Sequence, residues 1–127
     1  MADKLTSRQV SQLALLQTLP PRLEQMHRLI EEIAGLRADE SVARRLCRVL
    51  DATRAAADGV GLNAMAETMG VMSTMARRSG GMQMKIQGLR DGLRSLKINF
   101  DGAVREASIR TPQDVEQKPA EPPASAS

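Results

Sequence analysis

The chain has 127 residues, of which 42% are apolar, but its only aromatic residue is Phe100. This length allows one domain with a modest core, which aliphatic side chains, alanine and eight methionines must fill. The formal net charge of +3 is small for a nucleic-acid-binding protein, and no aromatic side chains accompany the basic residues as stacking platforms for bases. We therefore expect no nucleic-acid partner.

The cysteine count and the hydropathy pattern predict a cytoplasmic protein. Cys47 is the only cysteine, so the chain cannot form an intramolecular disulfide, and a reducing compartment is expected. The N-terminal residues lack the apolar run of a signal peptide, and no stretch of about 18 consecutive apolar residues occurs. We expect no membrane partner.

Two helices are predicted before residue 35. Thr6 or Ser7 is a suitable N-cap for the first, which should stop at Leu19 because Pro20 disfavours helical geometry in the residue before it. Pro20 and Pro21 suit the first turn of the second helix. The first helix should either lie across the end of a bundle or continue the second with a bend. The inward residues are predicted to be Val10, Leu13 or Ala14, and Leu16 or Gln17, then Leu23, Met26 or His27, Ile30, and Ile33 or Ala34.

Residues 39–78 are predicted to form a helical hairpin around the turn at residues 58–61. Apolar or small side chains recur there at three- and four-residue steps on both arms. Isolated helices of this length are marginal, so the hairpin needs partner helices to cover its apolar stripes. The stripes contain Val42, Leu46, Val49, Leu50, Thr53 and Ala57 on the first arm, and Leu62, Met65, Met69, Met72 and Ala76 on the second.

Charged side chains follow one face of the first hairpin arm. They are spaced so that helix-internal ion pairs can form, which predicts either a solvated face or a protein-docking surface. Ala52, Ala55 and Ala56 would let a second backbone come close in the docking interpretation. The charged residues are Arg44, Arg48, Asp51, Arg54 and Asp58.

A long helix is predicted over residues 82–107, about 39 Å in length and longer than the hairpin arms, so its end is expected to project from the bundle. Gly88 and Gly92 lie on one flank, where close approach of another helix would compensate for their low helix propensity. Its apolar side chains keep a seven-residue rhythm. They are Met82, Ile86, Leu89, Leu93, Leu96, Phe100, Val104 and Ala107.

Together these elements predict an all-α fold: an antiparallel four-helix bundle with an extra N-terminal helix and a disordered C-terminal tail. Residues 1–110 should form the domain. Residues 111–127 are rich in Pro, Ala, Ser, Gln and charged residues, which is typical of disorder.

The sequence offers no catalytic, cofactor-binding or metal-binding constellation. Gly59-Val60-Gly61 lacks the Gly-Lys-Ser/Thr of a phosphate-binding loop, and Cys47 has no neighbouring histidine that would activate it. His27, the only histidine, is interpreted as structural or solvated because no carboxylate or second ligand pairs with it. We expect a protein that is not an enzyme and has no cofactor.

Gly61-Leu62-Asn63-Ala64-Met65-Ala66-Glu67, together with the order of elements over residues 10–107, resembles the histidine phosphotransfer (Hpt) family of bacterial two-component signalling. That family has a four-helix bundle with a phosphorylated histidine in a pattern like His-x-x-Lys-Gly-Ser. Aligned on this stretch, Asp51 stands at the place of the histidine, Arg54 at that of the lysine and Ala55 at that of the glycine. The resemblance implies that phosphotransfer at this place is lost and that docking is kept.

The predicted function is therefore a non-catalytic signalling adaptor or regulator. Its partner would be a receiver domain, a histidine kinase or a similar regulator. The resemblance implies that receiver domains present an acidic phosphorylation pocket. The carboxylate of Asp51 would either imitate negative charge or simply lie within the arginine face. The predicted partner-binding residues are Arg44, Arg48, Asp51, Arg54 and Ala55.

Two alternatives stay open. In the first, the protein is a structural homo-oligomer that self-associates through the seam of Leu89, Leu93, Leu96 and Phe100 on the long helix. In the second, it is a phosphotransferase that uses His27. A concentration-dependent mass distinguishes the first from an adaptor, and a phosphorylation assay with His27→Ala distinguishes the second.

Overall fold

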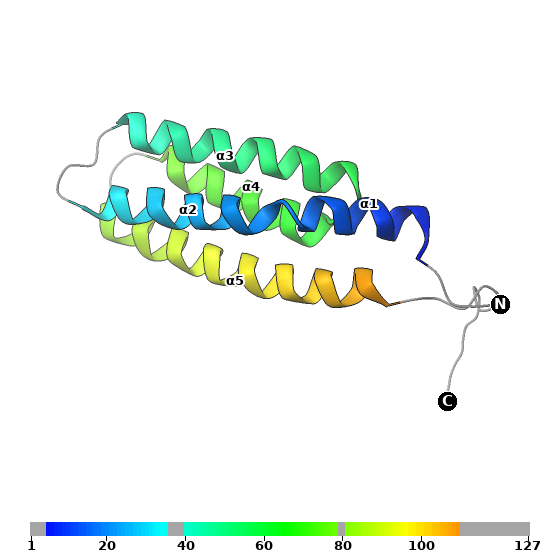
Figure 1. Ribbon diagram of the computed structural model, residues 1–127. Coiled ribbons are helices and arrows are strands. Elements are labelled where there is room, and N and C mark those ends of the chain that lie inside the picture. The colour runs from blue at the N-terminus through cyan, green and yellow to red at the C-terminus, as the bar shows by residue number, and fades with distance from the viewer. Residues whose placement is uncertain (1–4, 36–39, 79–80, 110–127) are drawn as a thin grey trace.

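The computed structural model describes residues 5–35, 40–78 and 81–109, and these form five helices and no strands. The all-α prediction is thereby confirmed for the described part of the chain. Figure 1 shows the helices lying side by side, with α1 running on from α2 in nearly the same direction. The helices are α1 (Ser7–Leu16), α2 (Leu19–Ala34), α3 (Glu40–Gly59), α4 (Asn63–Arg77) and α5 (Met82–Ser108).

The first helix begins where the sequence predicts and ends earlier. The Thr6 hydroxyl accepts a hydrogen bond from the Gln9 backbone N–H at 3.1 Å, and the Gln9 side chain accepts one from the Thr6 N–H at 2.8 Å, which is a capping box. The helix stops at Leu16, so the prediction that it continues to Leu19 was wrong. Leu19 is instead the first residue of α2 and is completely buried.

α1 continues α2 with a bend and covers the C-terminal end of α5, so the prediction that α5 projects was wrong. The side-chain amide of Gln9 donates a hydrogen bond to the Ile109 carbonyl, and that of Gln12 donates one to the Val60 carbonyl at 2.9 Å. Polar side chains therefore face inward on α1, while Val10, which the apolar spacing placed inside, is exposed.

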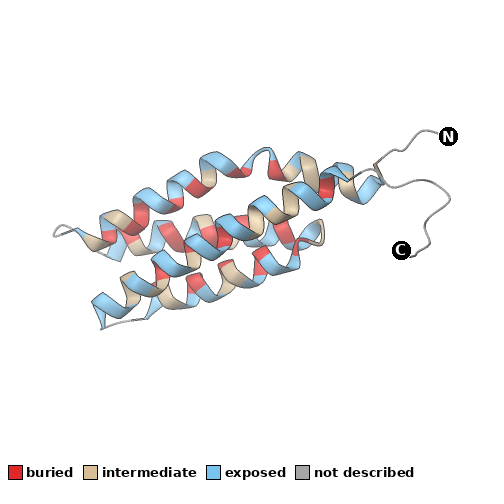
Figure 2. Cartoon of the chain, turned by 90° about the horizontal axis from the view of Figure 1, so that it is seen from below, coloured by how far each residue is buried: buried red, intermediate tan, exposed pale blue. Residues whose placement is uncertain are grey.

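The core lies between the helices, along the buried positions of Figure 2. Every predicted stripe residue of the hairpin is buried except Val49, which is half-buried. On α2, Met26 and Ile33 are buried whereas His27 is exposed, and Leu29 is a further buried residue that the predicted stripe omitted. On α5 the central leucines and Ala107 are buried, Ile86, Phe100 and Val104 are half-buried, and Met82 is exposed.

α4 and α5 approach closely at two glycines of α5, as predicted. A Cβ atom added to Gly92 would lie 2.6 Å from Met72 Cγ, and one added to Gly88 would lie 2.5 Å from Met75 Sδ. Met72 is completely buried, so it has no free space into which to move. The tail predicted for residues 111–127 lies outside the described residues, and its disorder stays a prediction.

We expect Gly92→Ala to destabilise the protein by about 1 to 3 kcal/mol, because overpacking against Met72 outweighs the helix propensity gained. Gly102→Ala is the matched control in the same helix, since no atom lies within 4 Å of its added Cβ. That variant should be more stable than wild type by up to about 1 kcal/mol. Urea denaturation followed by circular dichroism measures both. Equal stability of the two variants would contradict the close α4–α5 contact.

Candidate functional site

The five predicted partner-binding residues lie on one outward side of α3, here called the α3 face. Four of them are exposed and Asp51 is half-buried. Because they recur at three- and four-residue steps along one helix, they present a single continuous surface. The α3 face consists of Arg44, Arg48, Asp51, Arg54 and Ala55.

Asp51 is held in a network between α3 and α4. The Ser73 hydroxyl donates a hydrogen bond to Asp51 Oδ1 at 2.8 Å, and Arg77 Nη2 donates one to Asp51 Oδ2 at 2.5 Å. Arg77 Nη1 also donates to Ser73 Oγ at 2.7 Å, which closes the network. The Asp51 carboxylate therefore has its charge compensated within the chain.

This network sets the protonation of Asp51. Partial burial alone would raise the pKa of the carboxyl, but the hydrogen bonds from Ser73 and Arg77 and the charges of Arg77 and Arg54 outweigh burial, so the pKa is lowered. Arg77 correspondingly has a raised pKa, first because of its hydrogen bond to Asp51. Both groups are charged at neutral pH, and the pair joins α3 to α4.

Arg54 crosses from α3 to the neighbouring helix. A Cβ atom added to Gly70 of α4 would lie 3.1 Å from the Arg54 guanidinium carbon, so the guanidinium lies directly over that glycine. No carboxylate forms an ion pair with Arg54 among the described residues. Its positive charge is thus available to a partner from a defined position.

A cavity of about 510 Å³ adjoins the α3 face where α3, the end of α4 and the beginning of α5 meet. We call it the basic hollow. Its cations outnumber its carboxylates, and its floor is formed by small or apolar side chains. The lining consists of Arg44, Arg48, Arg77, Arg78 and Lys85 as cations, Glu40 and Asp51 as carboxylates, and Ala43, Cys47, Ala76 and Met82.

Only some of these cations are compensated. Arg44 lies 3.7 Å from Glu40, and Arg77 is paired with Asp51. No ion pair in the described part of the chain includes Arg48, Arg78 or Lys85. Sequence reasoning missed the contributions of α4 and α5 to this hollow, because nothing in the helical periodicity indicates which helix ends meet.

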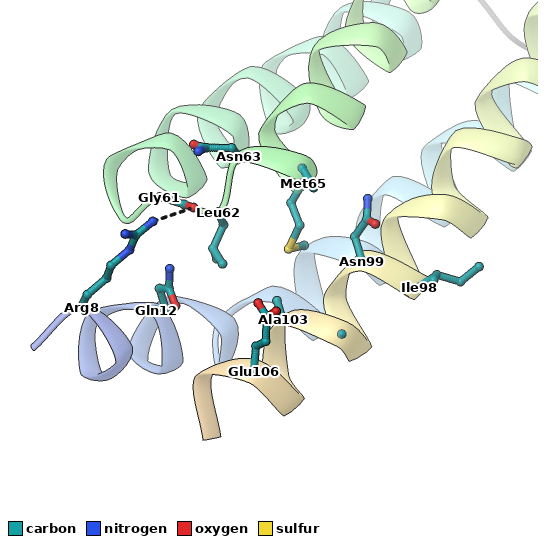
Figure 3. Close-up of a pocket in the computed structure, with 12 residues that line it drawn as sticks. Arg8, Gln12, Gly61, Leu62, Asn63, Met65, Ile98, Asn99, Ala103 and Glu106 are labelled. Carbon is teal, nitrogen blue, oxygen red and sulfur yellow. Dashed lines mark hydrogen bonds between the residues drawn. The ribbon is translucent and has the colours of Figure 1, made fainter. Parts of the chain in front are cut away.

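A second cavity, of about 610 Å³, lies at the opposite end, between α1, the α3–α4 turn and α5 (Figure 3). Its polar side chains mostly serve to hold the elements together. Arg8 Nη2 donates to the Gly61 carbonyl at 3.5 Å, Gln12 donates to the same turn, and Asn99 Nδ2 donates to Thr68 Oγ1 at 3.2 Å. We interpret the cavity as a gap left where Arg8 and Gln12 hold α1 against the α3–α4 turn.

The remaining candidate residues form no site in the described part of the chain. His27 is exposed on α2, and no hydrogen bond to its ring is found among the described residues. Cys47 is buried, with its Sγ 3.8 Å from the Ser73 carbonyl oxygen. Among the residues that the structure describes, no three potential metal ligands cluster, and no helix combines the length and apolarity needed to cross a membrane.

No family model, curated protein or solved structure matches the chain. The Hpt resemblance accordingly rests on the sequence pattern alone and stays a prediction.

We expect Asp51→Asn to lower the melting temperature at pH 7 only slightly, because the lost pair with Arg77 is partly exposed and screened by solvent. The folded-state pKa of Asp51 is lowered, so the stabilisation is present above the ordinary Asp pKa. It is lost as pH falls through the lowered folded-state value. Thermal melts from pH 7 to pH 2 should therefore show the wild-type and variant curves converging at the acid end.

Asp101→Asn is the control for this pH series, since Asp101 is exposed and forms no ion pair in the described part of the chain. Its melting temperature should follow that of wild type at every pH. A difference between wild type and Asp51→Asn that stays constant from pH 7 to pH 2 would contradict the charged pair.

Proposed function

We propose that this protein is a non-catalytic docking module of bacterial two-component signalling, built as an Hpt-like antiparallel four-helix bundle. Its α3 face binds an acidic surface of a receiver domain or histidine kinase. The observation that carries the proposal is the combination of exposed arginines on α3 with a carboxylate that is already compensated inside the chain.

Charge complementarity supports this kind of partner. A partner that approaches the α3 face meets the cations of Arg48 and Arg54, whereas the negative charge of Asp51 is balanced by Arg77. The Hpt resemblance implies a receiver domain with an acidic phosphorylation pocket, and cations opposite acidic groups increase both association rate and specificity. Asp51 thus serves as part of the arginine face and does not act as a mimic of a phosphorylated side chain.

Shape supports the same surface. Ala52 and Ala55 are exposed beside the arginines, and their small side chains allow the backbone of a partner to come close to α3. The Arg54 guanidinium lies over Gly70, where the missing side chain leaves room for it. Small residues on both helices therefore leave this part of the surface open to a partner.

The same residues support a non-catalytic role. The resemblance places a carboxylate where the phosphorylated histidine of an Hpt domain would stand, and Asp51 cannot form a phosphohistidine. The proposed module therefore binds signalling proteins in the cytoplasm without transferring phosphate.

Self-association through the leucine seam of α5 has less support. Leu89, Leu93 and Leu96 are buried among the chain's own helices, so the seam is used inside the protein. A homo-oligomer would need a different face.

We expect Arg48→Glu and Arg54→Glu each to weaken binding to the partner by about tenfold or more, equivalent to about 1.4 kcal/mol. Both changes should leave the free energy of unfolding within about 0.5 kcal/mol of wild type, because both side chains are exposed. A pull-down with the wild-type chain identifies the receiver domain or kinase, and calorimetric titration with the purified partner measures affinity.

Lys97→Glu provides the matched control, since it reverses one exposed charge on α5 away from the α3 face. It should bind with nearly wild-type affinity. If both arginine variants also bind with wild-type affinity, the docking surface is not the α3 face.

A further inference from the structure

We infer that the basic hollow is a binding site for a small phosphorylated molecule, namely a phosphate monoester with an apolar substituent. This inference concerns a site beyond the proposed docking function and does not depend on it. Three features carry it: uncompensated cations from three segments, an apolar floor, and a volume that suits a small ligand.

The first feature is charge. Arg48 of α3, Arg78 at the end of α4 and Lys85 of α5 line one hollow without an ion-pair partner in the described part of the chain. Packing of the helices brings these like charges together, and their repulsion falls when an anion binds between them. Guanidinium groups match phosphate oxygens in geometry as well as charge, so a phosphoryl group is the anion that fits best.

The second feature is the floor between the cations. Cys47 and Ala76 are only 7% and 3% exposed, and Ala43 adds a third small side chain. Met82, which is 48% exposed at the start of α5, borders this floor with a flexible thioether that adapts to different shapes. The floor offers an apolar contact that inorganic phosphate could not use.

The third feature is size. The hollow has a volume of about 510 Å³, within the range of roughly 300 to 1,000 Å³ that is usual for small-molecule sites. α5 also begins beside the hollow without a side-chain cap, so the N–H groups of its first turn add to the positive potential. A phosphate ester would place its anion among the cations and its substituent on the floor.

Two residues separate this site from the docking surface. Arg78 and Lys85 line the hollow but are not part of the α3 face, whereas Arg54 belongs to the α3 face and does not line the hollow. Variants at these positions can therefore test the two proposals independently.

The test is a titration of the full chain with phenyl phosphate, followed by NMR and calorimetry at low and moderate salt. We expect saturable binding, chemical-shift changes at the Met82 methyl group and the hollow's backbone amides, and weaker binding as salt rises. Inorganic phosphate should bind at least fivefold more weakly, because it lacks the substituent that contacts the floor.

The double variant Arg78→Ala/Lys85→Ala should weaken phenyl phosphate binding at least tenfold. Lys97→Ala/Arg105→Ala removes the same amount of charge from exposed positions elsewhere on α5 and should bind as wild type does. Circular dichroism shows whether each variant is folded. Arg54→Glu should also retain binding, so failure of the docking proposal would leave this result unchanged.

Three outcomes would overturn the inference. One is equal loss of affinity in the two double variants, which would indicate general attraction of anions. Another is equal affinity for phenyl phosphate and inorganic phosphate, which would exclude a role for the floor. The third is displacement of phenyl phosphate by a short oligoglutamate peptide that binds the chain more tightly than phenyl phosphate does, which would assign the hollow to an acidic protein segment.

Discussion

Packing of α4 against both α3 and α5 is the constraint on which the rest of the structure depends. Met69 and Met72 are completely buried in this arrangement, and Gly92 lets α5 come within contact of Met72. With the half-buried Phe100 as the only aromatic side chain, the core depends on this close approach to exclude water and to reach a high packing density. The same packing fixes where the ends of α3, α4 and α5 meet, and hence where the basic hollow forms.

Some charged side chains at this end of the molecule are paired with an opposite charge, and others are not. Asp51 is paired with Arg77 across the α3–α4 contact, while Arg48 and Arg54 retain positive charge on the outer side of α3. The pair is too exposed to contribute much stability. Its larger effect is on the surface potential, because it removes the one negative charge from the middle of the α3 face.

The sequence was sufficient to predict most of the buried residues of α3 and α4, since a periodicity of 3.6 identifies the apolar side of each helix. It missed Ala66 and Ser73, which are also buried. The sequence was less informative for α1, where Gln9 and Gln12 face inward and Val10 faces outward. The two glutamines donate to the carbonyls of Ile109 and Val60, which are 100 and 48 residues away in the chain. Local spacing cannot indicate such distant partners. The arginines of the α3 face were predictable from spacing along one helix. Arg77 and Lys85 were not, because their relation to α3 depends on how separate helices are aligned.

The methionines differ widely in solvent exposure, so their oxidation rates can report how often the core of the protein opens. Met26, Met69 and Met72 are completely buried, whereas Met84 is 82% exposed. Peroxide converts methionine to a polar sulfoxide, and a buried thioether reacts only when the surrounding helices separate. In one sample, the oxidation rate of Met84 therefore provides the reference for an accessible thioether, and the slower rates of the core methionines report how often each part of the interior meets solvent.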